Sequence, residues 1–271
     1  MIFDRIINYT IQMKKFRLAY KYCLHFLIAQ NTRGFGVHSP FMYNFTRFVL
    51  YERHSFYAFE AIEKIRLILI KDKRVLNIND YGTGCDRKRS VADIAKKTLK
   101  SPKQAQLFYR FANYLKVRNI LELGTSLGLT TSYLASSSID IKCISLEGCP
   151  EIAQVAQNNF DKLGIKNITL ITGNIDDTLA HVLIESEPLD LIFIDANHRK
   201  EAVLRYFEQC ISKVHKDTIL IVDDIYWSSD MEQAWHSIKM HSLVSSTIDI
   251  FHMGIVFFNS DLHKIHYKMR I

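Results

Sequence analysis

Short apolar runs alternate with amphipathic segments through the second half of the chain. The runs occupy residues 120–123, 141–146, 168–172, 189–194 and 218–222. Each of the first four is followed by a segment with helical spacing, most clearly at 150–163 and 200–213. Parallel strands that helices bury on both faces give this alternation. We therefore predict an α/β fold with a doubly wound, mostly parallel sheet.

The end of the chain predicts an antiparallel strand. A helical segment at 230–241 precedes strand-like runs at 244–250 and 255–259, which only the residues around Met253 separate. This connection is too short for a parallel crossover. We therefore expect a seven-stranded, Rossmann-like sheet whose final strand, near 255–259, lies antiparallel between its neighbours.

The first hundred residues follow a mostly helical pattern. Apolar positions recur with helical spacing through 41–70, whereas the glycines and proline of 34–40 interrupt that spacing and mark a loop. We predict a helical cap or substrate region at residues 1–101 and a cofactor-binding domain at 102–271.

The N-terminal segment, residues 1–30, is both apolar and basic. Charged residues interrupt it at Asp4, Arg5, Lys14, Lys15, Arg17 and Lys21. It holds no apolar run of membrane-spanning length, and it lacks the small-residue cleavage site of a signal peptide. We interpret it as a helical cap or partner surface; a helix lying in a membrane interface is the alternative.

Charge and cysteine content narrow the class of protein. The 271 residues carry a formal net charge of +7, which favours acidic partners, but the basic residues are spread along the chain. No RNA-binding module is recognisable, so we do not expect a nucleic-acid partner. None of the five cysteines forms a CxxC pair, which excludes a metal–thiolate motif and favours a reducing, cytoplasmic location.

A glycine-rich stretch at 120–131 predicts a nucleotide site. It joins an apolar run to a helical segment, where glycines let the backbone approach a ligand and the helix offers free N–H groups. Its candidate ligand-binding residues are Glu122, Gly124, Ser126, Gly128 and Thr130. Glu147 ends the next run about twenty residues on, where a carboxylate can bind ribose hydroxyls. A solvated strand-end acid is the alternative for Glu147. The spacing GxGxxG of dinucleotide folds is absent.

Two further stretches bear on this site. After the third run, Ile175 is placed to cover an adenine ring and Asp176 to accept from its exocyclic amine; a helix N-cap at Asp176 is the alternative. A second glycine-rich stretch, 79–85, is followed by the basic residues of 86–89. No strand ending in an acid follows it at the right distance, so we interpret it as a loop over the active site.

Acidic residues also end the fourth and fifth apolar runs. Asp195 follows one run, and Asp223 and Asp224 follow the next. Ligands bind at the carboxyl ends of neighbouring parallel strands, so these side chains are expected to converge. Three clustered carboxylates repel one another unless a cation relieves the repulsion, and oxygen donors suit Mg²⁺. The alternative is that Asp195 contacts only the cofactor while Asp223 and Asp224 cap a loop.

These motifs resemble those of a known family. The loop at 122–128 is similar to motif I of class I methyltransferases that use S-adenosylmethionine (SAM), and a parallel sheet with an antiparallel last strand is typical of that class. The acidic loops at 193–200 and 223–227 resemble those of the metal-dependent O-methyltransferases, the catechol and caffeoyl-CoA group. The resemblance covers about half of the chain.

This resemblance implies site roles. SAM is expected to contact Asp195 as well as the residues named above, and Asp195, Asp223 and Asp224 fall on the ligands of a divalent cation. His198 falls where the family has a lysine that deprotonates the substrate, and imidazole is a competent base near neutral pH. Asp224 stands where the family has asparagine. If His198 lacks this role, it is a surface histidine.

The predicted reaction is direct methyl transfer to a metal-held oxygen of a small hydroxylated acceptor, and an aromatic acceptor is favoured. A metal-independent methyltransferase for an amine, lipid or nucleic acid is one alternative, and a non-catalytic SAM-binding protein is another. The loop at 36–41 resembles a group of methyltransferases from Bacteroidetes-type bacteria, and His38 either faces the active site or is structural. Tyr226 and Trp227 either wall an aromatic acceptor or pack the core. The sequence leaves the acceptor, the need for metal, and the choice between monomer and homodimer open.

Overall fold

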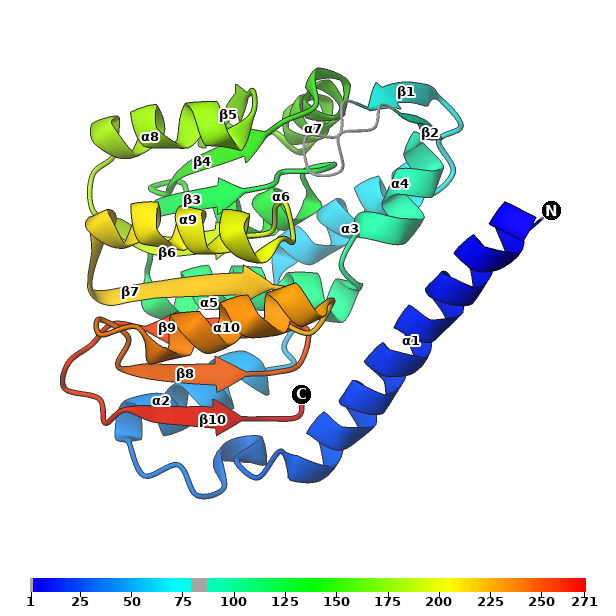
Figure 1. Ribbon diagram of the computed structural model, residues 1–271. Helices are drawn as coiled ribbons and strands as arrows, with labels where there is room; N and C mark the ends of the chain where they lie inside the picture. Colours follow the sequence, from blue (N-terminus) through cyan, green and yellow to red (C-terminus); the bar gives the residue numbers. More distant parts are fainter. Residues whose placement is uncertain (1, 79–86) are drawn as a thin grey trace.

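The computed structural model describes residues 2–78 and 87–271 and centres on an eight-stranded sheet (Figure 1). Its spatial order is β10-β8-β9-β7-β6-β3-β4-β5. The strands are β3 (Asn119–Leu123), β4 (Lys142–Glu147), β5 (Ile168–Thr172), β6 (Leu189–Ile194), β7 (Val214–Asp223), β8 (Ser246–Asp249), β9 (Met253–Phe257) and β10 (Ile265–Lys268).

The pairing directions confirm the predicted parallel sheet with an antiparallel strand. Strands β5, β4, β3, β6 and β7 pair in parallel, and β9 lies antiparallel between β7 and β8. The predicted count of seven strands is wrong, because β10 adds an eighth, parallel to β8, and the antiparallel strand is therefore not the last one. Only Tyr267 of β10 is buried. Residues 265–268 do not form an apolar run, so the sequence did not predict this edge strand.

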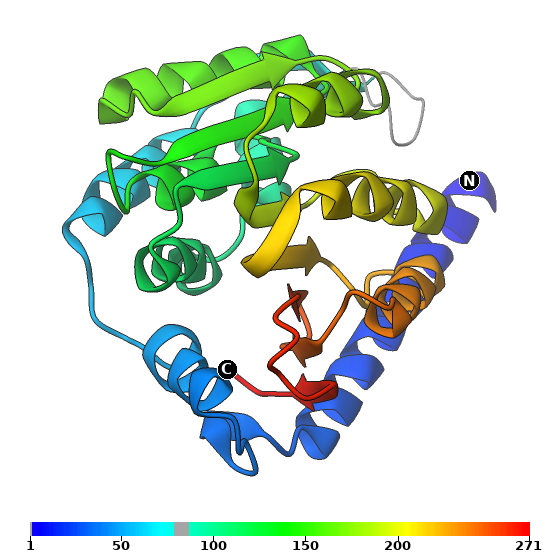
Figure 2. The ribbon, with the colours of Figure 1, turned by 90° about the vertical axis from the view of Figure 1, so that its left-hand side faces the viewer.

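Helices cover both faces of the sheet (Figures 1 and 2). One face carries α8 (Ile175–Glu185), α9 (Lys200–Cys210) and α10 (Ser229–Met240). The other carries α3 (Tyr57–Leu69), α5 (Pro102–Leu115), α6 (Leu129–Ala135) and α7 (Pro150–Leu163). Alternate residues of β6 enter the two cores: Phe193 packs on the side of α5, and Ile192 on the side of α9. The chain therefore has the three-layer arrangement that its apolar runs predicted.

The N-terminal part is mostly helical, as expected. It contains α1 (Ile2–Ile28), α2 (Pro40–Phe45), a π-helical turn at Thr46–Leu50, α3, and α4 (Val91–Thr98). It also contains an antiparallel pair that the sequence did not predict, β1 (Val75–Ile78) and β2 (Arg87–Ser90). The second glycine-rich stretch, 79–85, lies outside the described residues.

The N-terminal part shares its core with the sheet. Phe45 packs edge-on against Phe257 of β9, with ring centroids 5.3 Å apart, and Phe59 packs against Tyr133 of α6 at the same distance. One apolar cluster thus contains residues from both predicted parts. The boundary at 101/102 stays a prediction.

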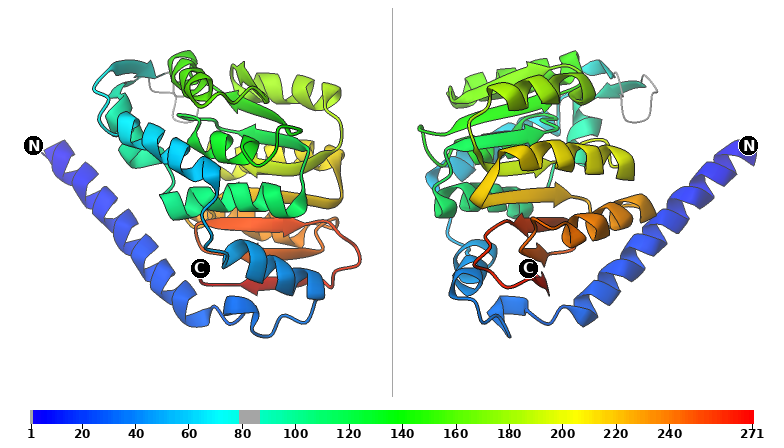
Figure 3. Two further views of the ribbon diagram at one scale, coloured as in Figure 1. Left: turned by 180° about the vertical axis from the view of Figure 1, so that it is seen from behind. Right: turned by 60° about the vertical axis from the view of Figure 1, so that its left-hand side comes forward.

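Helix α1 runs along the β8–β10 side of the molecule, and its first turns extend beyond the sheet (Figure 3). Arg17 and Lys21 form ion pairs with Glu232 of α10, and the imidazole of His25 hydrogen-bonds the Met269 carbonyl at 3.0 Å. Within the described part of the chain, no helix has the length and apolar character needed to cross a membrane.

Candidate active site

The loop between β3 and α6 depends on glycine at two positions. Gly124 has φ +102°, and a Cβ atom there would lie 2.2 Å from the carbonyl oxygen of Asp195. Gly128 has φ +81°, and a Cβ atom there would lie 2.6 Å from the ring of Phe160. Both glycines therefore serve the packing of the loop as well as access to its backbone.

Glu147 is held against this loop. It ends β4, is half-buried, and accepts hydrogen bonds from the backbone N–H groups of Ser126 at 2.8 Å and Cys149 at 3.0 Å. Burial raises the pKa of its carboxyl. Ser126 itself has a positive φ of 49°. The carboxylate is thus fixed by the backbone at the position where the sequence predicts ribose binding.

Glu122 lies beneath the loop and is fully buried. One carboxylate oxygen accepts from the Thr131 hydroxyl and from the Ser145 hydroxyl, the latter at 2.6 Å. The other oxygen has no hydrogen-bond partner among the described residues. Burial raises the pKa of Glu122 to about 8. Thr130 lies one residue into α6 and is half-buried.

The segment after β5 places Ile175 and Asp176 in the first turn of α8. Ile175 is buried. The N-cap is Asn174, whose side chain accepts from the Asp176 N–H at 3.1 Å, so the alternative of an N-cap at Asp176 is wrong. Burial raises the pKa of Asp176, but the Arg205 guanidinium, 2.6 Å away, outweighs this and holds the pKa below its ordinary value.

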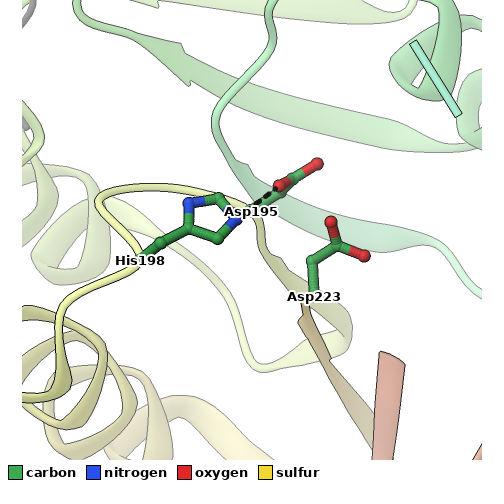
Figure 4. A group of neighbouring side chains, drawn as sticks. All are labelled: Asp195, His198 and Asp223. Carbon is green, nitrogen blue, oxygen red and sulfur yellow. Dashed lines mark ion pairs between the residues drawn. The ribbon is translucent and has the colours of Figure 1, made fainter. Parts of the chain in front are cut away.

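Asp195 and Asp223 meet at the carboxyl ends of β6 and β7, as expected (Figure 4). Donor atoms of Asp195, His198 and Asp223 all lie within 4.8 Å of one another. The imidazole Nε2 of His198 is 3.6 Å from Asp195 and 3.3 Å from the Asp224 carboxylate. Asp224 has φ 50° and does not join this three-residue group; it contacts the cluster through His198.

Lys100 bridges Asp195 and Asp223, a position that the sequence did not predict. Its Nζ lies 2.5 Å from Asp223 and 3.1 Å from Asp195, and its side chain is only 10% exposed. Lys100 sits between α4 and α5, directly before Ser101, the N-cap of α5. A lysine beside a helix start is ordinarily a solvated surface residue, so no local pattern marked it.

The charges of the cluster shift one another's pKa values. Burial raises the pKa of Asp195, but the ammonium of Lys100 and the imidazole of His198 outweigh it and lower that pKa. Burial and the charge of Asp195 raise the pKa of Asp223. Burial lowers the pKa of His198, but the carboxylates of Asp224 and Asp195 outweigh it and raise the value to about 9. The imidazole is therefore a cation at neutral pH.

Of the two aromatic residues that follow Asp224, Tyr226 packs against other residues and Trp227 is exposed. The Tyr226 hydroxyl donates to Asp249 at 2.5 Å, and its ring stacks on Phe251. Tyr226 is thus engaged in packing. Trp227 is 54% exposed, and His38 is an exposed residue of the loop before α2.

Comparison with known proteins identifies this part of the chain. A family described as "Methyltransferase domain" matches residues 121–225, which run from β3 to just beyond Asp224. These residues are similar to a methyltransferase domain. The domain contains the glycine loop, Glu147 and the acidic cluster, whereas Lys100 lies outside the matched residues.

Relatives of the methyltransferase domain include two bacterial proteins named catechol O-methyltransferase. The one from Niastella koreensis is 33% identical over 46% of this chain and 57% of its own length. The one from Mycobacterium tuberculosis is 29% identical over 46% of this chain and 56% of its own length. The chain thus spans somewhat more than half the length of these relatives. The predicted resemblance to the catechol-type group is confirmed.

Solved structures share the fold. An O-methyltransferase from Bacillus cereus in complex with SAH, the demethylated product of SAM, matches with a TM-score of 0.55 and 20% identity, over 80% of this chain and 96% of that one. The O-methyltransferase TomG from Streptomyces achromogenes, in complex with SAM, matches with a TM-score of 0.52 and 19% identity, over 60% of this chain and 82% of that one. These matches confirm the class I methyltransferase fold.

Proposed function

We propose that the protein is a SAM-dependent O-methyltransferase that acts on a small hydroxylated acceptor. The observation that carries the proposal is the arrangement of two sites at one edge of the sheet. The Glu147-bound glycine loop lies at the ends of β3 and β4, and the Asp195–Asp223 cluster lies at the ends of β6 and β7. The names of the catechol O-methyltransferase relatives support the hydroxyl acceptor.

SAM is assigned to the glycine-loop side. Glu147 binds the ribose, since its carboxylate is already oriented by two backbone N–H groups. Ile175 lines the adenine, and Asp176 accepts from the adenine amine while it stays paired with Arg205. Asp195 follows β6, which lies between β3 and β7, so it is the member of the acidic cluster assigned to contact SAM. The remaining residues assigned to the cofactor site are Gly124, Ser126, Gly128 and Thr130, together with Glu122, which supports the loop from beneath.

We further propose that a divalent cation such as Mg²⁺ binds the acidic cluster through Asp195, Asp223 and Asp224. Asp195 and Asp223 fit, because their carboxylates converge with the His198 imidazole within 4.8 Å and oxygen ligands suit a hard cation. Asp224 contacts His198 and has to turn toward the other two carboxylates to become a ligand. Such a cation lowers the pKa of an acceptor hydroxyl and orients it. His198 takes the hydroxyl proton in its neutral form, which requires that another positive charge offset the surrounding carboxylates.

Lys100 favours a second candidate, metal-independent methyl transfer. Its ammonium bridges Asp195 and Asp223, in the place that the cation needs. In that mechanism Lys100 provides the fixed positive charge, and metal binding is unnecessary. In the first mechanism, Lys100 has to move away from the carboxylates before a cation binds.

One assay separates the two candidates. Transfer of labelled methyl from SAM to catechol is measured in excess chelator, with and without added Mg²⁺, for the unaltered protein and for Lys100→Met. Loss of transfer in chelator and its recovery with Mg²⁺ support the cation. Full transfer in chelator, together with loss of transfer in Lys100→Met, supports the metal-independent reaction. Transfer to no hydroxyl acceptor under any of these conditions contradicts both.

A further inference from the structure

A cavity of about 560 Å³ opens beside the acidic cluster. Lys103, Leu107 and Arg110 of α5 line it, together with residues 50–53. Two contacts connect the cavity to the cluster. Ser101, in the lining, directly follows Lys100, and the carbonyl of His252, also in the lining, accepts the Asp224 N–H at 2.7 Å. A ligand in this cavity therefore lies next to the predicted reaction centre.

Arg110 is the unusual residue of this cavity. Its side chain lines the cavity although the residue is only 6% exposed. Its Nε has no hydrogen-bond partner among the described residues, and its Nη2 makes only a long contact, 3.4 Å, with the Gln106 amide oxygen. A guanidinium carries five N–H donors, and a buried charge without a counter-ion costs free energy. Burial accordingly lowers the pKa of Arg110.

Other basic residues surround the same space. Arg53 and Lys103 line the cavity, and in the described part of the chain no carboxylate lies within 4.0 Å of the charged groups of Arg53, Lys103 or Arg110. A second hollow of about 650 Å³ shares Arg53 and Lys103 with the cavity and adds Arg33 and Arg270. The positive lining thus continues outward from Arg110.

Glu52 is an acidic side chain of the lining, and donors of Arg53 and His54 converge on one of its two carboxylate oxygens, Oε1. Its carboxylate accepts from the Arg53 N–H at 2.6 Å, from the His54 N–H at 2.8 Å and from the His54 ring at 2.5 Å. Glu52 favours the charged form of Arg110 by longer-range attraction without contacting it. The Arg110 guanidinium, which lies over the Phe59 ring at 5.8 Å, therefore has no carboxylate partner among the described residues.

We propose that this cavity binds an anionic group, a carboxylate or phosphate, carried by the acceptor whose hydroxyl is methylated at the cluster. That the acceptor's hydroxyl is methylated at the cluster rests on the proposed function. That its anionic group binds in the cavity rests on Arg110, Arg53 and Lys103. A planar guanidinium binds either anion through two parallel hydrogen bonds. Ser101 and Arg110 are nine residues apart along α5, so the anion lies within roughly 14 Å of the cluster end of the cavity.

The experiment compares two acceptors that differ in one charge: dihydroxycinnamate and its uncharged amide. Calorimetry measures their binding to the protein with SAH bound. We expect the acid to bind at least about tenfold tighter than the amide. Arg110→Met should remove that preference and leave the affinity for the amide unchanged, and Arg110→Lys should retain part of it. Arg53→Gln, at an exposed side chain, should reduce the preference without risk to the fold. Arg118→Gln, an exposed change at the far end of β3, is the matched control and should alter nothing.

Inorganic phosphate provides the second probe. It should compete with the acid and raise the apparent KM for that acceptor without affecting SAM binding. Equal binding of acid and amide, a preference that survives both Arg110→Met and Arg53→Gln, or phosphate binding that does not compete with the acceptor overturns the proposal. Methylation of both acceptors without charge discrimination defeats this proposal alone. Binding of the acid through Arg110 with no methylation of either acceptor defeats the proposed function and leaves the anion site intact.

Discussion

The two halves of the candidate active site are built in different ways. On the β3–β4 side, Glu147 is bound by backbone N–H groups, one from its own turn and one from the neighbouring loop. On the β6–β7 side, Asp195 and Asp223 are bound by charged side chains, and Lys100 comes from the junction of α4 and α5. The first half is defined by main-chain geometry and the second by a balance of charges. Substitutions on the β3–β4 side should therefore change cofactor affinity and stability, and substitutions on the β6–β7 side should change the rate of methyl transfer.

The largest effect is expected on the charged side. Asp223→Asn keeps the size of the side chain but removes a charge that Lys100 or a metal cation requires. We expect methyl transfer to fall by about 100-fold or more. Calorimetry should show SAM affinity within a factor of about three of the unaltered protein. An equal loss of SAM affinity and of transfer rate would show that the two halves are not separable.

Substitution of a glycine in the loop after β3 should lower the stability of the protein. Gly124→Ala adds a Cβ 2.2 Å from the Asp195 carbonyl oxygen at a φ of +102°, so we expect a loss of about 2–3 kcal/mol in the free energy of unfolding. Gly164 also has a positive φ, +67°, but a Cβ there meets nothing within 4 Å. Gly164→Ala is thus the matched control and should cost about 1 kcal/mol. Chemical denaturation measures both, and equal losses would show that the close approach does not matter.

Glu147 should determine cofactor affinity. Glu147→Ala removes the carboxylate assigned to the ribose and should weaken SAM binding at least tenfold, about 1.4 kcal/mol. Glu185→Ala, an exposed change at the end of α8, serves as the control. Calorimetry with SAM gives both values. If Glu147→Ala binds SAM as well as the control does, the assignment of Glu147 is wrong.

Glu122 should make stability depend on pH. Its pKa is raised from an ordinary 4.5 to about 8, so the native state keeps a proton that the unfolded state releases between these values. Stability should therefore fall as pH rises from about 5 to 8. Glu122→Gln removes this titration and should gain about 1 kcal/mol or more relative to the unaltered protein on going from pH 5 to pH 8. Thermal unfolding at both pH values measures the difference; parallel behaviour of the two proteins would contradict a raised pKa.

The same contrast explains what could be predicted from the sequence. Gly124 and Ser126 lie in the loop after β3, and Glu147 ends β4, the next strand along the chain. Consecutive strands of such a unit pair side by side, so the proximity of these residues could be predicted. Asp195 and Asp223 follow because parallel strands end at one edge. Lys100 could not be predicted, since its place depends on how α4 and α5 pack against that edge. The orientation of the Asp224 side chain depends on its positive φ. An aspartate does not require a positive φ, so this orientation could not be predicted from the residue type.

The edge strand β10 and the N-cap of α8 also could not be predicted from the sequence. β10 contributes one buried residue, Tyr267, so its place in the sheet depends on hydrogen bonding to β8 rather than on an apolar pattern. The N-cap of α8 is Asn174 and not Asp176, a difference that depends on the backbone turn after β5. Periodicity predicted the buried strands, and it could not predict elements that hydrogen bonds alone define.

The central claim is methyl transfer from SAM to a hydroxyl oxygen at the Asp195–Asp223 cluster. The most direct test incubates the protein with methyl-labelled SAM and catechol, with and without Mg²⁺, and identifies the products by mass spectrometry. We predict the monomethyl ether of catechol together with an equal amount of SAH, and no product from Asp223→Asn beyond about one per cent of that amount. SAM binding without methylation of catechol or of any other hydroxylated acceptor, or undiminished product from Asp223→Asn, would contradict the claim.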